Sequence, residues 1–428
     1  MIRFLLKGLA RDRSRSLFPL LTVIAGVALT VVGQAWVRGT ESELVHASAA
    51  FSTGHVKVAP RGAAAESDTA SAELALDHAG ALLADLRRRH PSLGWTPRIR
   101  FGGLLDVPDA AGETKVQAPV AGLAIDLLSP GSLEPGILNV GRAIVKGRMP
   151  SAASEVLVSD QLFDRLGLRL GDSATLISTT RFGSVATANL RIVGTVRFGV
   201  SAIDRGALVA DLTAIQQALD MEDAVGEVLG FFPDQVYRDP DARAVAQAFN
   251  AETSSRPAPP DPDLAAVMSP LRDDPGLATI LDITAVLTRA QVAIFVFVMS
   301  IVLWNAGLMG SLRRYGEIGI RLAVGERKGH VYGTLVAESL MIGVAGSVIG
   351  TAIGVGASYY LQERGFDISP FLRNASLLIS DVLRAKVTAG SFVVGFVPGV
   401  LSTLLGSSIS GAGIYRRQTA RLMKEFEA

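Results

Sequence analysis

The residues able to do chemistry are scattered along this 428-residue chain and form no recognisable motif. The five histidines are His46, His55, His78, His90 and His330. None of them forms the His-Glu-x-x-His pair that holds zinc on one helix face. No Gly-x-Ser-x-Gly elbow exposes a nucleophilic serine, and cysteine is absent. We therefore predict a protein without catalytic residues, a metal site or a cofactor of its own.

A nucleotide-binding loop is also missing from the sequence. Such a loop needs Gly-Lys followed by Ser or Thr, so that backbone amides and the lysine hold the phosphates. The dipeptide Gly-Lys occurs nowhere in the chain. If the protein uses ATP, we expect a partner polypeptide to bind it.

Four long uncharged stretches must position whatever function the chain has. They cover residues 16–37, 290–312, 339–362 and 387–415. A helix of about 20 residues crosses a bilayer core of about 30 Å, so each stretch is long enough to span a membrane. We predict four transmembrane helices, one followed by three, with a large α+β extracytoplasmic domain between the first and second. A cleaved signal peptide is the alternative for the first stretch, although its apolar part exceeds the usual length of about 7–15 residues.

The charge distribution predicts how these spans are oriented. Residues 39–282 hold 21 Lys and Arg against 31 Asp and Glu, whereas the rest of the chain holds 20 against 9. Basic clusters lie before the first span, between the second and third, and after the fourth, and short basic segments are retained in the cytoplasm. We predict an inner (plasma) membrane protein with both termini cytoplasmic. Because the outer segment is acidic, we expect no nucleic-acid binding.

Alternating and capping patterns predict the elements of the outer segment. Strands are expected at 54–59, 155–159, 173–178, 189–196, 207–210 and 228–232. Helices are expected at 71–90 and 160–166, after a cap at Asp211, and after Asp239 as cap with Pro240 at the first position. The proline-rich residues 254–263 are expected to form a loop.

The basic loop between the second and third spans contains a short helical pattern. Tyr315, Ile318 and Leu322 recur at helical spacing, which predicts an amphipathic helix outside the bilayer. Two interpretations remain open on this pattern alone. The helix lies on anionic lipid, or it is a coupling helix that docks into a groove of a cytoplasmic ATPase.

Small residues in the third and fourth spans predict where helices pack closely. Gly346, Gly350 and Gly354 share one face of the third span, and Gly395 and Gly399 stand four apart in the fourth. Glycine lets helix backbones approach in lipid, where no hydrophobic force drives association. Glu338 lies inside the third span, and we expect it to snorkel or to bond a neighbouring helix.

Residues 313–356 read RRYGEIGIRLAVGERKGHVYGTLVAESLMIGVAGSVIGTAIGVG. This segment resembles the FtsX/MacB-type permease family of ABC transporters, which includes lipoprotein-releasing (LolC/LolE-like) and MacB-like members. The matching positions are Glu317, Ile318, Gly319, Arg321, Gly325, Glu338, Gly346 and Gly350. Residues 157–172 and 190–209 are similar to the family's periplasmic core domain. One span, a large outer domain and three further spans is also that family's layout.

The resemblance implies three parts: residues 1–38 with the first span, a periplasmic core domain at 39–282, and a permease domain at 283–428 with a coupling loop at 313–330. It implies that this loop contacts a separate ABC ATPase. The implied contact residues are Tyr315, Glu317, Ile318, Arg321, Leu322 and Gly325.

Mechanotransmission is the implied mechanism, in which ATP hydrolysis by the partner moves the outer domain. A second permease copy or paralogue and membrane lipids are further expected partners. A lipoprotein, a periplasmic carrier or an adaptor would be the partner on the outer side. Lipoprotein release is the favoured activity. MacB-like efflux of drugs or peptides, and FtsX-like regulation of cell-wall hydrolases, remain as alternatives.

Overall fold

Two compact units make up the chain in the computed structural model, which describes residues 13–65, 74–109, 111–255, 261–313, 315–368 and 382–411. At 13–16, 64–65, 306–313 and 315–318 the structure describes the backbone alone. The first unit, here called the membrane unit, comprises Met1–Ser42, Asp282–Phe366 and Leu383–Ala428. The second, here called the sheet unit, comprises Glu43–Leu281 and Asp367–Val382.

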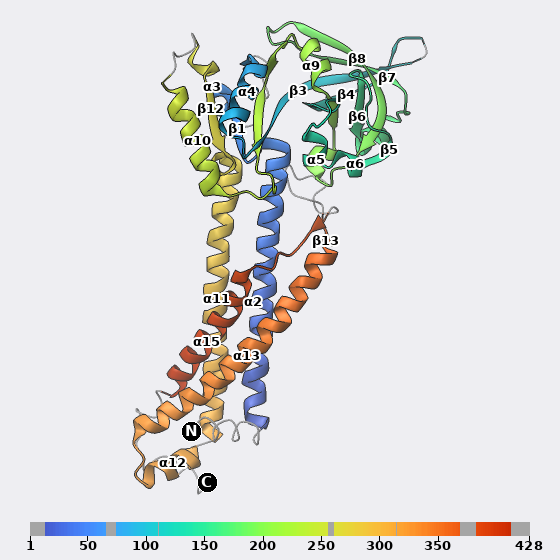
Figure 1. Cartoon of the computed structure of the whole chain (residues 1–428). Helices are drawn as coiled ribbons and strands as arrows, with labels where there is room; N and C mark the ends of the chain where they lie inside the picture. The colour runs from blue at the N-terminus through green and yellow to red at the C-terminus, as the bar shows by residue number, and fades with distance from the viewer. Residues whose placement is uncertain are drawn as a thin grey trace. The chain divides into compact units, whose positions relative to one another are not determined.

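Four helices among the described residues are long and apolar enough to cross a membrane. They are α2 (Arg13–Ser48), α11 (Pro275–Arg313), α13 (Lys328–Arg364) and α15 (Ala389–Gly411), drawn in blue, yellow, orange and red in Figure 1. The first lies near the N-terminus and an α+β domain separates it from the second. The predicted fold class is thus confirmed, and the chain is a multi-pass membrane protein. The predicted end of the fourth span, at 415, falls outside the described residues.

Three of these helices extend beyond the apolar stretches that predicted them. The helix α2 continues past residue 37 to Ser48, α11 begins at Pro275 instead of 290, and α13 begins at Lys328 instead of 339. An apolar window marks only the part of a helix that suits lipid. At the end of α2 and the start of α11, Leu44 and Leu277 are buried in a core of the sheet unit, so packing against protein continues the helix there.

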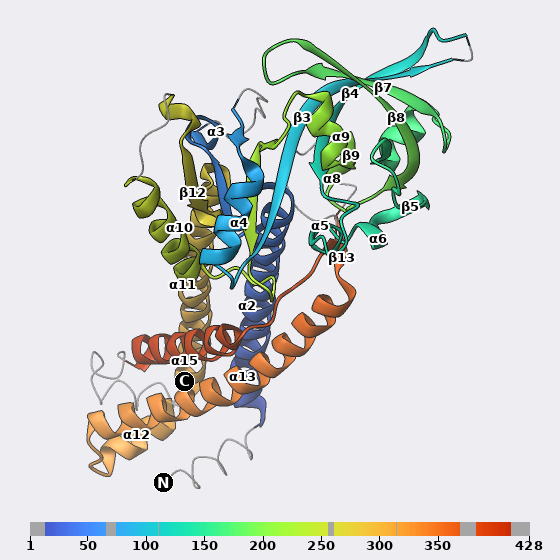
Figure 2. The same ribbon diagram turned by 45° about the horizontal axis from the view of Figure 1, so that its top comes forward.

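The sheet unit is built on one ten-stranded sheet. Its strands are β1 (Val56–Pro60), β3 (Gly94–Pro108), β4 (Thr114–Ile125), β5 (Ile144–Gly147), β6 (Glu155–Ser159), β7 (Ser173–Thr179), β8 (Val185–Val196), β9 (Ala207–Asp211), β11 (Glu227–Phe231) and β12 (Ala266–Pro270). Their order is β12-β1-β11-β3-β4-β9-β6-β8-β5, and β7 pairs with β3 and β8. Figure 2 shows the β3–β4 and β7–β8 hairpins as long twisted ribbons. Most pairs are antiparallel, whereas β4 with β9 and β6 with β8 are parallel.

Short helices and strands complete the described chain. The helices are α3 (Arg61–Ala65), α4 (Ala79–Arg89), α5 (Glu134–Ile137), α6 (Val140–Ala143), α7 (Asp160–Leu166), α8 (Ser201–Asp204), α9 (Leu212–Ala218), α10 (Asp239–Thr253) and α12 (Tyr315–Ala323). A π-helix follows α2 at Ala49–Thr53, and 3-10 turns lie at Pro262–Leu264 and Leu271–Asp273. The strands β2 (Leu76–Asp77), β10 (Ala224–Val225), β13 (Phe366–Asp367) and β14 (Val382–Leu383) are short.

Two of the expected helix starts are wrong. The predicted helix at 71–90 begins only at Ala79, because β2 occupies Leu76–Asp77 and His78 adopts a left-handed conformation with φ of 55°. Asp239 is the first residue of α10 and not its cap, which is Arg238. The Asp239 carboxylate instead accepts hydrogen bonds from the Tyr237 hydroxyl at 2.6 Å and the Arg243 Nε at 2.9 Å.

The other expected elements lie within a few residues of their observed bounds. The strands β6 and β9 and the helix α7 occupy the expected positions. Asp211 caps α9 by accepting a hydrogen bond from the Thr213 backbone N–H at 3.1 Å. Of the expected loop at 254–263, residues 256–260 fall outside the described part of the chain.

The two faces of β11 pack into different cores, because successive side chains of a strand point to opposite faces. Val228 belongs to the large core formed with α4, α9 and α10. Leu229 and Phe231 belong to a smaller core with Leu44 and Leu277. The ends of α2 and α11 within the sheet unit therefore pack on the same face of the sheet.

The histidine His55, between the π-helix and β1, is buried in this region. Its Nδ1 accepts a hydrogen bond from the Phe232 backbone N–H at 3.0 Å, and its ring lies against Phe231, Phe232 and Tyr237. Burial lowers the pKa of His55 to about 4. The ring is therefore neutral at physiological pH, as the acceptor role of its Nδ1 requires.

A pH dependence of stability follows from this depressed pKa. Between about pH 6.5 and 4 the unfolded chain binds a proton at His55 that the folded chain does not, so stability is lost as pH falls through this window. We expect the thermal midpoint of the detergent-solubilised chain to fall less steeply over that range in His55→Asn, which keeps an acceptor for Phe232 but does not titrate. Parallel pH profiles of the two proteins would contradict this assignment.

Candidate functional site

The basic loop between the second and third spans forms the short helix α12, as the spacing of its apolar residues predicted. Its end is a tight turn at Gly325, which has φ of 98°. The Gly325 N–H donates to the Leu322 carbonyl at 3.1 Å and the Glu326 N–H donates to the Arg321 carbonyl at 3.0 Å. This pair of backbone hydrogen bonds ends the helix. It requires a left-handed conformation at residue 325, which favours glycine. Gly325 therefore fixes how α12 leads into α13.

Of the predicted contact residues, Arg321 and Leu322 have described side chains. The Arg321 guanidinium pairs with Glu326 at 2.9 Å, and the other oxygen of Glu326 lies 2.6 Å from the His330 Nδ1. Leu322 packs against the fully buried Val331 of α13. These contacts hold α12 against the start of α13.

The side chains of Tyr315, Glu317 and Ile318 fall outside the description, although their backbone lies in α12. The docking role of all six predicted contact residues stays a prediction.

The predicted glycines of α13 lie where this helix approaches α2, and this line of close contact is here called the glycine seam. A Cβ atom added at Gly346 would come within 2.9 Å of the Val23 side chain. At Gly350 it would lie 2.7 Å from the Ile24 carbonyl oxygen, and at Gly354 it would lie 2.9 Å from the Ala28 carbonyl oxygen. Hydrogen in place of a methyl group thus permits backbone contact along three successive turns.

A second seam joins α13 to α15. A Cβ atom added at Gly395 would meet the Thr351 Oγ1 at 2.4 Å, and one at Gly399 would meet the Ser347 Oγ at 2.3 Å. On the opposite side Gly343 of α13 accommodates Thr403 of α15. The two hydroxyls of α13 therefore lie directly against the glycine backbone of α15. Such close approach favours weak Cα–H···O contacts between helices.

The remaining predicted residue, Glu338, lies 10 positions after the start of α13 and is half-buried. Its role stays a prediction.

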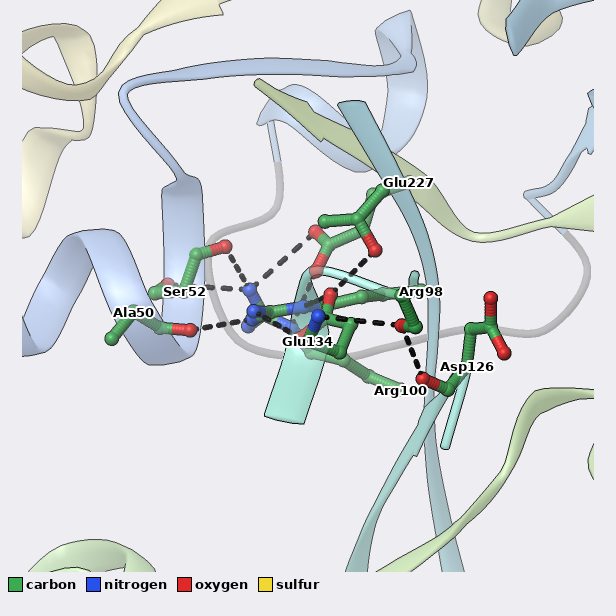
Figure 3. Close-up of polar contacts among 9 residues, drawn as sticks. Ala50, Ser52, Arg98, Arg100, Asp126, Glu134 and Glu227 are labelled. Atoms are coloured by element: carbon green, nitrogen blue, oxygen red, sulfur yellow. Dashed lines mark hydrogen bonds and ion pairs between the residues drawn. The ribbon is translucent and has the colours of Figure 1, made fainter. Parts of the chain in front are cut away.

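Sequence reasoning missed a polar cluster where the π-helix meets the sheet, shown in Figure 3. Arg98 on β3 and Glu134 at the start of α5 are both fully buried and form a two-point pair. The Arg98 Nε and Nη2 donate to the two Glu134 oxygens at 2.7 and 2.8 Å. Its Nη1 donates to the Ala50 carbonyl at 2.6 Å. Thr96 also donates to Glu134, at 2.8 Å.

The neighbouring arginine on the same face of β3 repeats this arrangement. The Arg100 Nε donates to Glu227 of β11 at 3.0 Å, and its Nη2 donates to the Ser52 carbonyl. Carbonyls in the last turn of a helix have no helical N–H ahead of them, and cations are favoured at that end. The two arginines supply both the donors and the charge. The alternation of Arg98 and Arg100 with apolar Ile99 and Phe101 was the available signal, but it does not reveal burial.

Comparison with known proteins finds a family match in the C-terminal third of the chain. Residues 290–419 match the FtsX-like permease C-terminal family. The matched range contains α12, α13 and α15, so the similarity to the FtsX-like permease family lies in the C-terminal part of the chain. The resemblance predicted from residues 313–356 is confirmed.

Curated relatives match a limited segment. The macrolide export ATP-binding/permease protein MacB of Hyphomonas neptunium is 29% identical over 106 residues, which is 25% of this chain and 16% of that protein. The protein of that name from Bdellovibrio bacteriovorus is 32% identical over 114 residues, or 26% and 15% of the two chains. The aligned segment is thus less than a fifth of either relative's length.

A solved structure also overlaps the chain. The crystal structure of the periplasmic region of MacB from Actinobacillus actinomycetemcomitans aligns with a TM-score of 0.35 and 9% identity. The alignment covers 53% of this chain and 92% of that one. At this TM-score the likeness does not establish a shared fold, and the resemblance of the outer domain stays a prediction.

The glycine seam gives a prediction on stability. Changing Gly350→Ala places a methyl group against the Ile24 carbonyl and should destabilise the chain by about 1–3 kcal/mol. The control is Gly356→Ala on the same helix, where no atom apart from the adjacent residues and the backbone of that helix turn lies within 4 Å of the added carbon. Thermal unfolding in detergent should show a lower midpoint only for Gly350→Ala. Equal midpoints for the two variants would contradict the close approach of α13 and α2.

Proposed function

We propose that this chain is the permease subunit of an ABC transporter, which couples ATP hydrolysis by a separate ATPase to movement of a substrate at the outer face. The observation that carries the proposal is α12, a short amphipathic helix fixed by Gly325 and Glu326 within the residues that match the FtsX-like permease domain. Leu322 holds the helix to Val331 of α13, and the exposed side chains of Ile320 and Val324 are available to a partner. Because the sequence contains no nucleotide-binding loop, the proposed ATPase is another polypeptide.

Orientation and stoichiometry are part of the proposal. We propose that α12 and both termini lie in the cytoplasm and the sheet unit outside; the support is the basic character of the segments that flank the spans. An ATPase dimer presents two docking grooves, so a second permease copy or a paralogue is required. The outer domain then receives motion through the transmembrane helices.

For the substrate we propose a lipoprotein released from the membrane. Its support is a resemblance in the sequence alone: the Gly54-His55-Val56 segment shortly after the first span and the turn from Phe198 to Asp204 look similar to those of lipoprotein-releasing permeases. In that turn the Asp204 carboxylate accepts backbone N–H bonds from Phe198 at 2.8 Å and Gly199 at 2.9 Å. Efflux of small molecules is the second candidate, because the relatives carry the name macrolide export protein.

The proposal is tested by purifying the full-length chain from native membranes and identifying what is bound. An ABC ATPase together with an acylated lipoprotein supports the proposal as stated. An ATPase with an outer-membrane channel or adaptor supports the permease and replaces release by efflux. A complex without any ATPase, from membranes that contain the chain in active form, overturns the permease function.

Docking through α12 gives a sharper prediction. Because Arg321 pairs with Glu326 inside the loop, charge reversal at Arg321 alone would disturb both docking and the loop. The double variant Arg321→Glu/Glu326→Arg restores the internal pair with reversed charges. We expect both the single and the double variant to lose ATPase binding in a pull-down by roughly tenfold or more, the effect of about 1.4 kcal/mol.

The outcome that contradicts direct docking is rescue by the double variant. Restored binding would show that Arg321 acts only by folding the loop. Glu317→Arg provides a second measurement, since the family resemblance places this residue in the contact. Membrane insertion should be unchanged in all three variants.

A further inference from the structure

The geometry points to a joint between the first transmembrane helix and the outer sheet that is locked by two arginines. We infer that Arg98 and Arg100 form a latch that holds the end of α2 in one orientation on the sheet. Motion of the first span then turns the sheet instead of being absorbed at the joint. This inference rests on the proposed function, because it names residues that would transmit the movement.

The backbone between the π-helix and β1 is where motion of α2 would be lost without the two arginines. The π-helix ends at Thr53, and Gly54 follows with φ of 61° before β1 begins at Val56. A Cβ atom at Gly54 would lie 2.9 Å from the Val56 carbonyl and 3.0 Å from the Leu229 Cβ. A single glycine with a left-handed φ is a weak connection for transmitting torque, because glycine tolerates a wide range of backbone angles.

Apolar packing alone does not fix the direction of the helix end. Leu44 and Ala49 lie against Leu229 and Phe231, and such contacts are not directional. The bonds from Arg98 to the Ala50 carbonyl and from Arg100 to the Ser52 carbonyl are directional and approach the helix end two residues apart. Together they oppose rotation of the helix end about Gly54.

The carboxylates explain why the arginines keep their positions. Glu134 from α5 accepts hydrogen bonds from the Nε and Nη2 of Arg98, and Glu227 from the neighbouring strand β11 accepts one from the Nε of Arg100. A fully buried ion pair contributes little net stability relative to apolar residues of similar volume, because both charges lose their water. Here the ion pair fixes the orientation of the Arg98 side chain, so that its Nη1 donates to the Ala50 carbonyl at the helix end.

The test uses the absence of cysteine from the chain, which lets two introduced cysteines carry spin labels selectively. His46 on the sheet-unit end of α2 and Glu222 beside β10 are both exposed and both lie in the sheet unit. The distance distribution between labels at His46→Cys and Glu222→Cys reports how firmly the helix end is held. The full-length chain in lipid nanodiscs is measured well below its unfolding temperature.

Arg98→Lys is the informative variant. Lysine keeps a positive charge opposite Glu134 but cannot bond both its oxygens and the Ala50 carbonyl in the same fork geometry. The control for the hydrogen-bond pattern is Arg148→Lys at an exposed site, since Arg148 also donates from two nitrogens to a carboxylate, Glu155, and to the Met149 carbonyl at 2.9 Å. Among the described contacts of Arg148, none is with the π-helix. Arg98→Met with Glu134→Leu removes both buried charges together and keeps the site apolar in case Arg98→Lys does not fold.

We expect the label distribution to widen by about twofold in Arg98→Lys and in the double variant, and to keep its width in Arg148→Lys. In the complex with the ATPase, substrate moved per ATP hydrolysed should fall roughly three- to thirtyfold while ATPase binding is unchanged. Unchanged width in the Arg98 variants overturns the latch.

Equal transport per ATP overturns its role in coupling. Failure of the unmodified chain to bind any ATPase would defeat the proposed function, whereas the label distribution would still decide whether the latch exists.

Discussion

A fully buried guanidinium determines how the end of α2 meets the sheet of the sheet unit. Arg98 has no access to water, so its charge and its donors must be satisfied by protein groups brought from distant parts of the chain. Glu134 satisfies the charge and the Ala50 carbonyl takes a remaining donor. Three elements, β3, α5 and the π-helix after α2, are thereby fixed at one point. The position of the helix end follows from that requirement.

The membrane unit obeys a different constraint. Between helices in lipid there is no hydrophobic gain from association, so contact depends on shape. Gly350 and Gly354 bring α13 onto the backbone of α2, and Gly395 and Gly399 bring α15 onto α13. The helix α13 is therefore the central element of the described seams, and it also begins directly after α12. A displacement at α12 would reach α13 first.

Part of this organisation could be predicted from the sequence because local signals determine it. The helix α7 is bounded by Ser159, whose side chain accepts a bond from the Leu162 N–H, and by Gly167 in a left-handed conformation. Likewise, glycines spaced four residues apart indicate which face of a helix can pack closely against another helix. The helix α12 was predictable because Tyr315, Ile318 and Leu322 repeat at the helical period. The predicted helix at 71–90 failed because the left-handed His78 interrupts a pattern that looks continuous.

The polar latch could not be predicted, because its partners are far apart in the sequence. Arg98 and Glu134 are 36 positions apart and Arg98 and Ala50 are 48 apart. Arginine and glutamate are among the residues least often fully buried, so their types suggest a solvated surface. The sheet order places β3 beside β11 and so brings Arg100 to Glu227. Glu134 on α5 and Ala50 on the π-helix reach Arg98 only through the tertiary fold.

The central claim is that an ATPase docked at α12 changes the conformation of the sheet unit when that ATPase binds nucleotide. Spin labels at Tyr359→Cys, exposed on α13, and Glu222→Cys, exposed in the sheet unit, test it in the assembled complex. Double electron–electron resonance should show a distance distribution that shifts when a non-hydrolysable ATP analogue is added in the presence of the ATPase. The shift should vanish without the ATPase. An unchanged distribution in a complex that hydrolyses ATP would contradict the account.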